Sequence, residues 1–502
     1  MQPWNNASKI AFRICFIFYL IMCIPFSREW YDRLFAVHWT ALHYRDIYDI
    51  TRFQPAIIKF SNSSWNLMGY MDWLLILAIA VIGGLIFSYV DRKRSSYYAL
   101  NYWLMVLIRY RAAIGIIGFG FLKIFPVQMP FPSLAMLNTD FGQYSAQKLY
   151  WVSVGIVPWY QSFAGVFEIG AGILLLFRKT TVYGAILLFA AMADIVYVNF
   201  SYDGNVHIYS SYFVILAAYL LAYDLPYFHA FFIKERYVIP YHYYPSFSEK
   251  WQQYVRAGLK SALLFLFVGV TAYLQLMNFL YDPYKQPSLK GVTVLRGNYN
   301  VTFFSINDKE IAYDPLDTIR WQHVTFEKWS TFTFSTNQPQ NLDLSNGVAL
   351  PMRDINRTFE LTGMAGRRTY FYYEADTAQQ ILHLHNKNPL NKKAGITSNT
   401  FYLAGGRKHI VQDTITVIPD VIRKEINGID KRARSWRRQK HILLEYANAQ
   451  PGEDMTLHYT TRDGSRIIMT GVTRNRDSLY IVLDKVENHY LLTESSLNAG
   501  NY

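Results

Sequence analysis

The chain has 502 residues, of which 52% are hydrophobic and only 17% are charged, so part of it is more apolar than a soluble domain usually is. Its net charge of +13 is compatible with nucleic-acid binding, but lysine and arginine are scattered and aromatic residues are abundant, which favours a membrane protein facing anionic lipid. Cys15 and Cys23 lie in one apolar segment, about 12 Å apart on a helix, which excludes a disulfide between them. We therefore expect a lipid bilayer, and no nucleic acid, as a partner.

Long apolar runs separated by charged or turn residues occupy residues 1–281, which we interpret as a transmembrane helical domain. Most of them reach the roughly 17 to 25 residues that cross a bilayer core, and the shortest is 209–223. The first run is interpreted as an anchor because no small-residue cleavage site follows it. The seven predicted spans are 10–26, 70–90, 104–125, 159–177, 182–200, 209–223 and 258–281.

The distribution of basic residues in the loops predicts the orientation. If the spans alternate, the basic stretches Asp91–Arg94, Arg178–Thr180 and 234–260 share one side, which the positive-inside tendency makes cytoplasmic. The N-terminus is then cytoplasmic, and everything after Tyr281 is periplasmic or extracellular. We expect a multi-pass protein of the cell (inner) membrane.

The segment 28–69 departs from this pattern, because it carries several basic residues on the predicted outer side. It also contains acidic residues and is rich in tryptophan and tyrosine, so we interpret it as an amphipathic segment at the membrane interface.

After Tyr281 the pattern changes to that of strands. A turn-rich linker, 282–290, precedes residues 291–502, where apolar and polar residues alternate with period two between turn signals such as Arg462–Gly464. This predicts an all-β extracytoplasmic domain, a barrel or a sandwich. The predicted strands are YNVTFFSI, VTFEKWSTFTF, RTFELTG, RTYFYYEA, MTLHYTT, RIIMTGVT and LYIVLDKV.

Three further stretches of this domain carry residues that are common in binding sites. The basic stretch 422–440 is either a patch for anionic lipid or a partner protein, or a solvated insertion between strands, and we favour the insertion. The paired glycines of 403–409 fit a turn between strands better than a phosphate site. His383 and His385 share one face of a strand, but no third ligand is near in sequence, and no metal site is predicted.

Ionisable residues inside the spans are the candidates for chemistry, because a charge in the bilayer is costly unless it is paired or hydrated. Lys123 lies near the outer end of the third span, Glu168 near the middle of the fourth, and Asp194 in the outer half of the fifth. These three are the candidate catalytic residues. Asn199, Asp203 and His207 fall at the same outward rim and are the candidate residues of a ligand pocket.

Two roles remain open for Lys123. It forms a structural ion pair with Glu168 or Asp194, or it acts as a base in a partly desolvated pocket. The glycines of the third and fourth spans allow close helix approach, and packing is their expected role. Arg109 and Arg111 lie toward the inner end of the third span, where snorkelling or headgroup contact is ordinary.

The motifs RYRAAIGIIGFGFLKIF, FAGVFEIGAGILLLFRKTTVYGAIL and VNFSYDGNVHIYSSYFVILAAYLLAYDL resemble the DoxX-like integral membrane proteins over about 104–224. The resemblance implies a four-helix core linked to quinone or thiol redox chemistry, but this chain lacks a suitable thiol pair. A more distant similarity is to the vitamin K-dependent carboxylase group. It implies that Lys123 in GFLKI is a base, but in SSWNLMGYM the region of Met68 lacks the catalytic histidine of those enzymes.

These patterns lead to two functional hypotheses. The first is a DoxX-like membrane protein whose outward polar pocket binds a lipophilic small molecule such as a quinone, in redox or proton-coupled chemistry. The alternative is a non-catalytic membrane anchor that presents the β-domain to an envelope protein partner or for envelope assembly.

Overall fold

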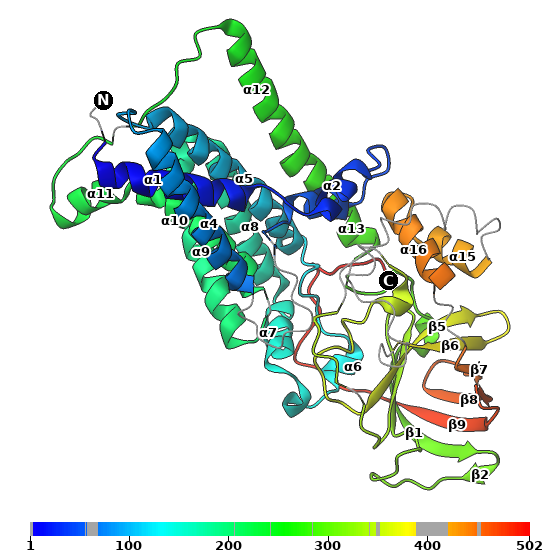
Figure 1. Cartoon of the computed structure of the whole chain (residues 1–502). Helices are drawn as coiled ribbons and strands as arrows, with labels where there is room; N and C mark the ends of the chain where they lie inside the picture. Colours follow the sequence, from blue (N-terminus) through cyan, green and yellow to red (C-terminus); the bar gives the residue numbers. More distant parts are fainter. Residues whose placement is uncertain are drawn as a thin grey trace. The chain divides into compact units, whose positions relative to one another are not determined.

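The computed structural model describes residues 4–55, 57, 69–204, 206–240, 242–283, 285–340, 342–347, 352–387, 420–448 and 453–502. The chain forms two compact units, shown in Figure 1. The first, here called the helical unit, consists of Met1–Val37, Asp46–Ile124 and Phe163–Tyr273. The second, the barrel unit, consists of His38–Arg45, Phe125–Ser162 and Leu274–Tyr502. The barrel unit therefore includes a segment, Phe125–Ser162, from within the predicted helical domain.

Six helices among the described residues are long and apolar enough to cross a membrane, and a seventh span results if one bent helix pair is counted. The bent pair is α10 (His207–Ala222) with Leu225–Ile233, at 63°, and Pro226 lies just after the break. The six are α1 (Asn6–Cys23), α4 (Gly69–Val90), α5 (Tyr98–Ile124), α8 (Pro158–Leu176), α9 (Thr181–Ser201) with the turn before it, and Lys250–Tyr281, which contains α12 (Lys250–Leu264) and α13 (Thr271–Tyr281). The multi-pass membrane architecture is thereby confirmed.

Residues 28–69 only partly follow the interfacial interpretation. Helix α2 (Arg28–Phe35) is amphipathic, with Phe35 83% exposed, as an interfacial helix would be. Helix α3 (Tyr44–Thr51) differs, because Ile47 and Tyr48 are 2% and 4% exposed. The interfacial interpretation is therefore wrong for α3, whose side chains pack inside the protein instead of lying on its surface.

Eight strands of the barrel unit form a closed antiparallel barrel, because β1 pairs with both β3 and β9. The short strand β2 (Lys309–Glu310) pairs only with the end of β1. The strands of the barrel are β1 (Gly297–Ile306), β3 (His323–Phe326), β4 (Thr331–Ser335), β5 (Arg368–Asp376), β6 (Ile381–Asn386), β7 (Met455–Thr460), β8 (Arg466–Thr473) and β9 (Ser478–Val486). The predicted β-domain is confirmed, and of the two predicted folds, a barrel or a sandwich, the structure has the barrel.

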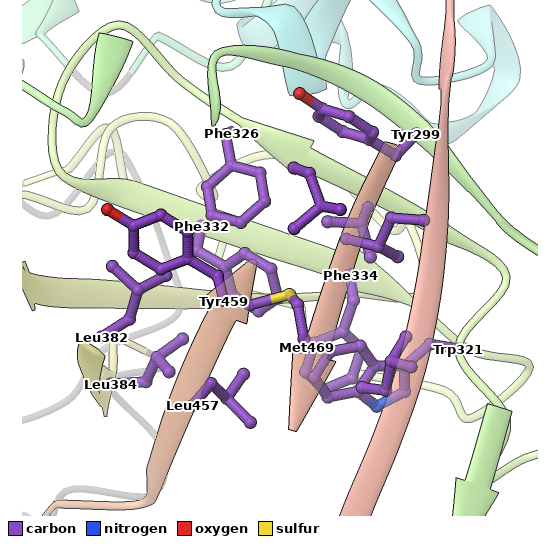
Figure 2. Close-up of a cluster of buried hydrophobic side chains, with 14 of the residues drawn as sticks. Tyr299, Trp321, Phe326, Phe332, Phe334, Leu382, Leu384, Leu457, Tyr459 and Met469 are labelled. Atoms are coloured by element: carbon purple, nitrogen blue, oxygen red, sulfur yellow. The ribbon is translucent and has the colours of Figure 1, made fainter. Parts of the chain in front are cut away.

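Apolar side chains fill the interior of the barrel (Figure 2). Burial alternates along β7, β8 and β9, so that on β8 Ile467 and Met469 are fully buried while Arg466 and Thr470 are exposed. An apolar interior with polar outer positions is the pattern of a water-soluble barrel, and the reverse of a membrane-spanning one.

One prediction for this region is wrong, and a second is wrong in part. The stretch 357–363 is not a strand but a series of turns after Asp354–Asn356, and its polar as well as its apolar side chains are buried, so their alternation does not mark one exposed face. The basic stretch 422–440 lies between β6 and β7, but it is not simply solvated. It runs from α15 (Asp420–Gly428) into α16 (Trp436–Asn448), and within it Ile422 and Ile429 are buried.

The segment Phe125–Ser162 carries α6 (Leu134–Leu137) and α7 (Ala146–Gly155) within the barrel unit. Glu327, in the turn between β3 and β4, accepts hydrogen bonds from Leu134 N at 3.0 Å and Ala135 N at 2.8 Å. These bonds satisfy free backbone N–H groups at the start of α6. The segment is thus fixed to the barrel through a buried carboxylate.

We expect Met469→Ala to destabilise the barrel unit by about 2 to 5 kcal/mol, because it removes a fully buried side chain and leaves a cavity. The matched control, Thr470→Ala, changes the adjacent exposed residue of β8 and should cost less than about 0.5 kcal/mol. Denaturant unfolding of the full chain in non-ionic detergent measures both. Equal effects of the two substitutions would contradict the inward and outward assignment of this strand.

Candidate functional site

Lys123 and Glu168 form an ion pair within the helical unit. Lys123 lies in the last turn of α5, and Glu168 lies near the middle of α8. Lys123 Nζ donates a hydrogen bond to Glu168 Oε1, and the two residues are only 8% and 3% exposed. Each buried charge compensates the other, which lowers the cost of both. The predicted pairing of Lys123 with a carboxylate is therefore present, and Glu168 is the partner.

Glycines bring α5 and α8 together around this pair. A Cβ atom on Gly165 would lie 2.6 Å from both Gly120 O and Ile124 N, a distance that real Cβ atoms do not adopt. A Cβ atom on Gly172 would lie 3.1 Å from Ala113 O. The two backbones approach at these positions because no side chain separates them, as in other small-residue contacts between membrane helices.

The two other acidic candidates lie on the surface of the helical unit. The side chain of Asp194, on α9, is exposed. Asp203 is also exposed and has a φ of 53°, a left-handed conformation that fits its place in the turn between α9 and α10. Neither has a contact with Lys123 or Glu168 among the described residues.

Asn199 and His207 are buried but use their polar atoms elsewhere. Asn199 Nδ2 donates to Ile195 O of its own helix at 2.7 Å. The His207 ring stacks against Phe200, with centroids 4.5 Å apart, and its Nδ1 lies 3.3 Å from the hydroxyl of Tyr70. The structure thus brings together Lys123 and Glu168 from the six sequence candidates, and the binding role of the other four stays a prediction.

The snorkelling interpretation of Arg109 and Arg111 is wrong. Their exposed fractions are 9% and 3%, so neither guanidinium extends into the surrounding solvent or lipid. The reason is the start of α5, which lies at Tyr98 instead of at 104. Arg111 is therefore the 14th of the 27 residues of α5, at the middle of the helix. Arg109 Nη1 donates to Thr181 Oγ1 at 3.1 Å.

The barrel unit contains a buried ionic cluster that the sequence did not reveal. Arg357 Nη2 lies 2.5 Å from Asp282 Oδ1, and Arg438 Nε lies 3.2 Å from Asp282 Oδ2. Both arginines also contact Asp354 Oδ1, at 3.4 and 3.3 Å. All four side chains are 1% exposed or less. The cluster joins the residue after α13, the turn before 357 and helix α16.

Several buried titratable groups of the barrel unit have displaced pKa values. Burial raises the pKa of Glu445 to about 7, although it accepts hydrogen bonds from Arg353 N and Asn356 Nδ2. Burial likewise raises the pKa of Glu327 to about 7 and lowers that of Lys285 to about 7. Each of these three groups is enclosed by the packing of the barrel unit.

His383, on β6, has its Nδ1 2.9 Å from Glu453 Oε1, and His385 stacks on Tyr372. Within the described ranges, no group of three or more histidine, cysteine or acidic side chains is arranged to hold a metal ion. The paired glycines of 403–409 lie outside the described residues.

Comparison with known proteins gives no match: no family model, no curated protein and no solved structure is similar to this chain.

We expect Gly165→Ala to lower the thermal stability of the helical unit, because the new methyl group would meet the backbone of α5. Gly170→Ala on the same helix is the matched control, since a Cβ atom there has no neighbour within 4 Å. Thermal unfolding of the two variants in one non-ionic detergent provides the comparison. The close-packing assignment fails if the two substitutions have the same effect.

We expect Glu445→Gln to weaken the pH dependence of stability of the barrel unit. The carboxyl pKa rises from 4.5 to about 7 on folding, so its favourable contribution is present below pH 4.5 and is lost as the pH rises through 7. The wild type should therefore lose more stability than the variant between pH 5 and pH 8. The exposed Glu310→Gln serves as control and should retain the wild-type slope. An unchanged slope in Glu445→Gln would contradict the assignment.

Proposed function

We propose that the helical unit binds a lipophilic small molecule, such as a quinone, through the Lys123–Glu168 pair. One observation carries this proposal. Glu168 Oε1 accepts the hydrogen bond from Lys123, but Oε2 is buried and has no hydrogen-bond partner among the described residues. Leaving a buried acceptor unsatisfied costs about 1 to 3 kcal/mol, and more for a charged group. The hydroxyl of a bound quinol, the reduced form of a quinone, would supply the missing bond, whereas a quinone carbonyl would accept only from Lys123.

The pair offers complementary groups to such a ligand. An ammonium group has three N–H donors and suits a quinone carbonyl, whereas a carboxylate only accepts and suits a hydroxyl. The proposal is limited to binding, because reduction of a quinone would also require an electron donor of a kind that the pair does not supply. Membership of the DoxX-like group over 104–224 is part of the proposal and rests on the motif resemblance alone.

A second candidate function is that of a membrane anchor that presents the barrel unit to an envelope partner. The specific observation that favours it is the close approach of the α5 and α8 backbones at Gly120 and Gly165. Beside this contact, the Lys123–Glu168 ion pair links the two helices and has a structural role. The filled barrel interior is also more suited to presenting an outer surface than to enclosing a ligand.

Mass spectrometry of lipids and quinones that copurify with the full chain in mild detergent separates the two candidates. We expect the wild type to retain a discrete lipophilic compound and Glu168→Gln to lose at least about tenfold of it, since the neutral amide weakens both charged contacts by more than about 1.4 kcal/mol. Asp194→Asn, which neutralises an exposed carboxylate on a neighbouring helix, is the control and should retain the compound.

Lys123→Met, which keeps the length of the side chain, should have the same effect as Glu168→Gln. Thermal unfolding of each variant distinguishes loss of ligand from loss of fold. Equal retention of the compound by all variants, or no compound in any sample, would overturn the binding proposal. If the wild type contains no compound and Glu168→Gln and Lys123→Met both lower the temperature of thermal unfolding, the anchor function is supported.

A further inference from the structure

Arg111 lies deep inside the helical unit with incomplete hydrogen bonding. It is 3% exposed, and its Nη2 donates a hydrogen bond to the carbonyl oxygen of Phe53. Its Nε and Nη1 atoms are buried and have no hydrogen-bond partner among the described residues. A guanidinium carries five N–H donors and keeps its charge in a protein. Most of its hydrogen-bonding capacity is therefore unused.

A second unsatisfied donor lies beside it on another helix. The hydroxyl of Tyr209, on α10, is also buried without a hydrogen-bond partner within the described part of the chain. The polar side chains that interact with the guanidinium are those of Tyr209, Tyr212 and Cys23, all of them neutral in their usual forms. The hydroxyl of Tyr212 is already used, since it donates to Met22 O at 2.8 Å. Unsatisfied donors from α5 and α10 thus gather around one cation.

The charge of Arg111 is likewise uncompensated. Over the described ranges, no carboxylate lies within ion-pairing distance of Arg111, in contrast to Lys123 and the arginines of the barrel unit. Its neighbours are aromatic: the guanidinium carbon lies 4.0 Å from the ring centroid of Phe53, 5.1 Å from that of Tyr212 and 6.0 Å from that of Phe213. Cation–π contacts compensate part of the desolvation cost but provide no anion.

A structural role for Arg111, as a hydrogen-bond donor to non-helical backbone, explains only its bond to Phe53. Phe53 belongs to a non-helical stretch after α3, and such backbone needs hydrogen bonds from the protein when it is buried among membrane helices. The Nη2 bond to Phe53 supplies one. A neutral donor would do this at lower cost, so the retained charge and the two remaining nitrogens call for another partner.

We propose that Arg111, with Tyr209, binds the carboxylate of a long-chain amphiphile such as a fatty acid. One monoanion neutralises the single guanidinium, and its oxygens accept from one free edge of the guanidinium, at Nε or at Nη1, and from the Tyr209 hydroxyl. Phe53 and Phe213 suit the adjoining acyl chain. A planar carboxylate also needs less room at this tightly packed position than a phosphodiester carrying two ester groups. This inference is independent of the proposed function of Lys123 and Glu168.

The test is binding of radiolabelled oleate to the purified full chain in non-ionic detergent, with oleyl alcohol and phosphatidylglycerol as competitors. We expect unlabelled oleate to compete at least about tenfold better than either, because the site recognises a charged carboxylate. Arg111→Gln should lose this preference, and Arg111→Lys should restore part of it. Arg109→Gln is the matched control, because Arg109 lies on the same helix but donates to Thr181.

Tyr209→Phe keeps the proposal testable if Arg111→Gln does not fold, since it removes only the hydroxyl and leaves the Phe53 contact intact. We expect it to weaken oleate binding about threefold to tenfold. Lys123→Met should leave oleate binding unchanged, which separates this site from the proposed function. Unchanged affinity in both Arg111→Gln and Tyr209→Phe would overturn the inference. Equal competition by oleyl alcohol, or stronger competition by phosphatidylglycerol, would overturn the choice of a carboxylate.

Discussion

Burial of charge is the constraint on which the barrel unit depends. Asp282, Asp354, Arg357 and Arg438 are withdrawn from water, and each is tolerated only because an opposite charge lies within 3.4 Å. Asp282 directly follows α13, so the end of the last candidate span is held by residues that come much later in the chain. Removing one member would leave the others buried and unpaired, which costs more than the pair itself contributes. The cluster thus holds the end of α13 to the turn before 357 and to α16 within the barrel unit.

The same constraint gives different results for the two cations of α5. Lys123 is paired with Glu168, and the glycines beside it remove the side chains that would otherwise separate α5 from α8. Arg111 has aromatic rings and one carbonyl group instead of an anion among the described residues. The pair accounts for the buried lysine but leaves Glu168 Oε2 unsatisfied, whereas no opposite charge among the described residues accounts for the buried guanidinium and its unused donors.

Local patterns in the sequence were sufficient for the candidate membrane spans and for most strands, but not for α15 and α16 or for the long-range contacts between strands. Period-two alternation predicted the strands on either side of the Arg462–Gly464 turn, because one face of each strand is buried and the other is solvated. Closure of the barrel depends on pairing between β1 and β9, which are far apart in the chain and carry no mutual signal. The same alternation wrongly predicted a strand at 357–363. There the arginine, threonine and glutamate side chains are buried along with the apolar ones, so the alternation does not mark a buried and a solvated face.

The candidate site shows a related limit, since hydropathy gives the depth of a residue in a span but not its direction around the helix. Successive residues of a helix are about 100° apart, so Asp194 and the buried Met192 of α9 lie on different faces, and Asp194 is exposed. The position assigned to a residue along its span also depends on where the helix begins. Because α5 begins at Tyr98 instead of at 104, Arg111 lies at the middle of the helix and not toward its end. On α5, Arg111 and Lys123 are separated by 12 residues, about 18 Å along the axis. One polar head group cannot contact both, so the two cations define separate positions for polar groups in the helical unit.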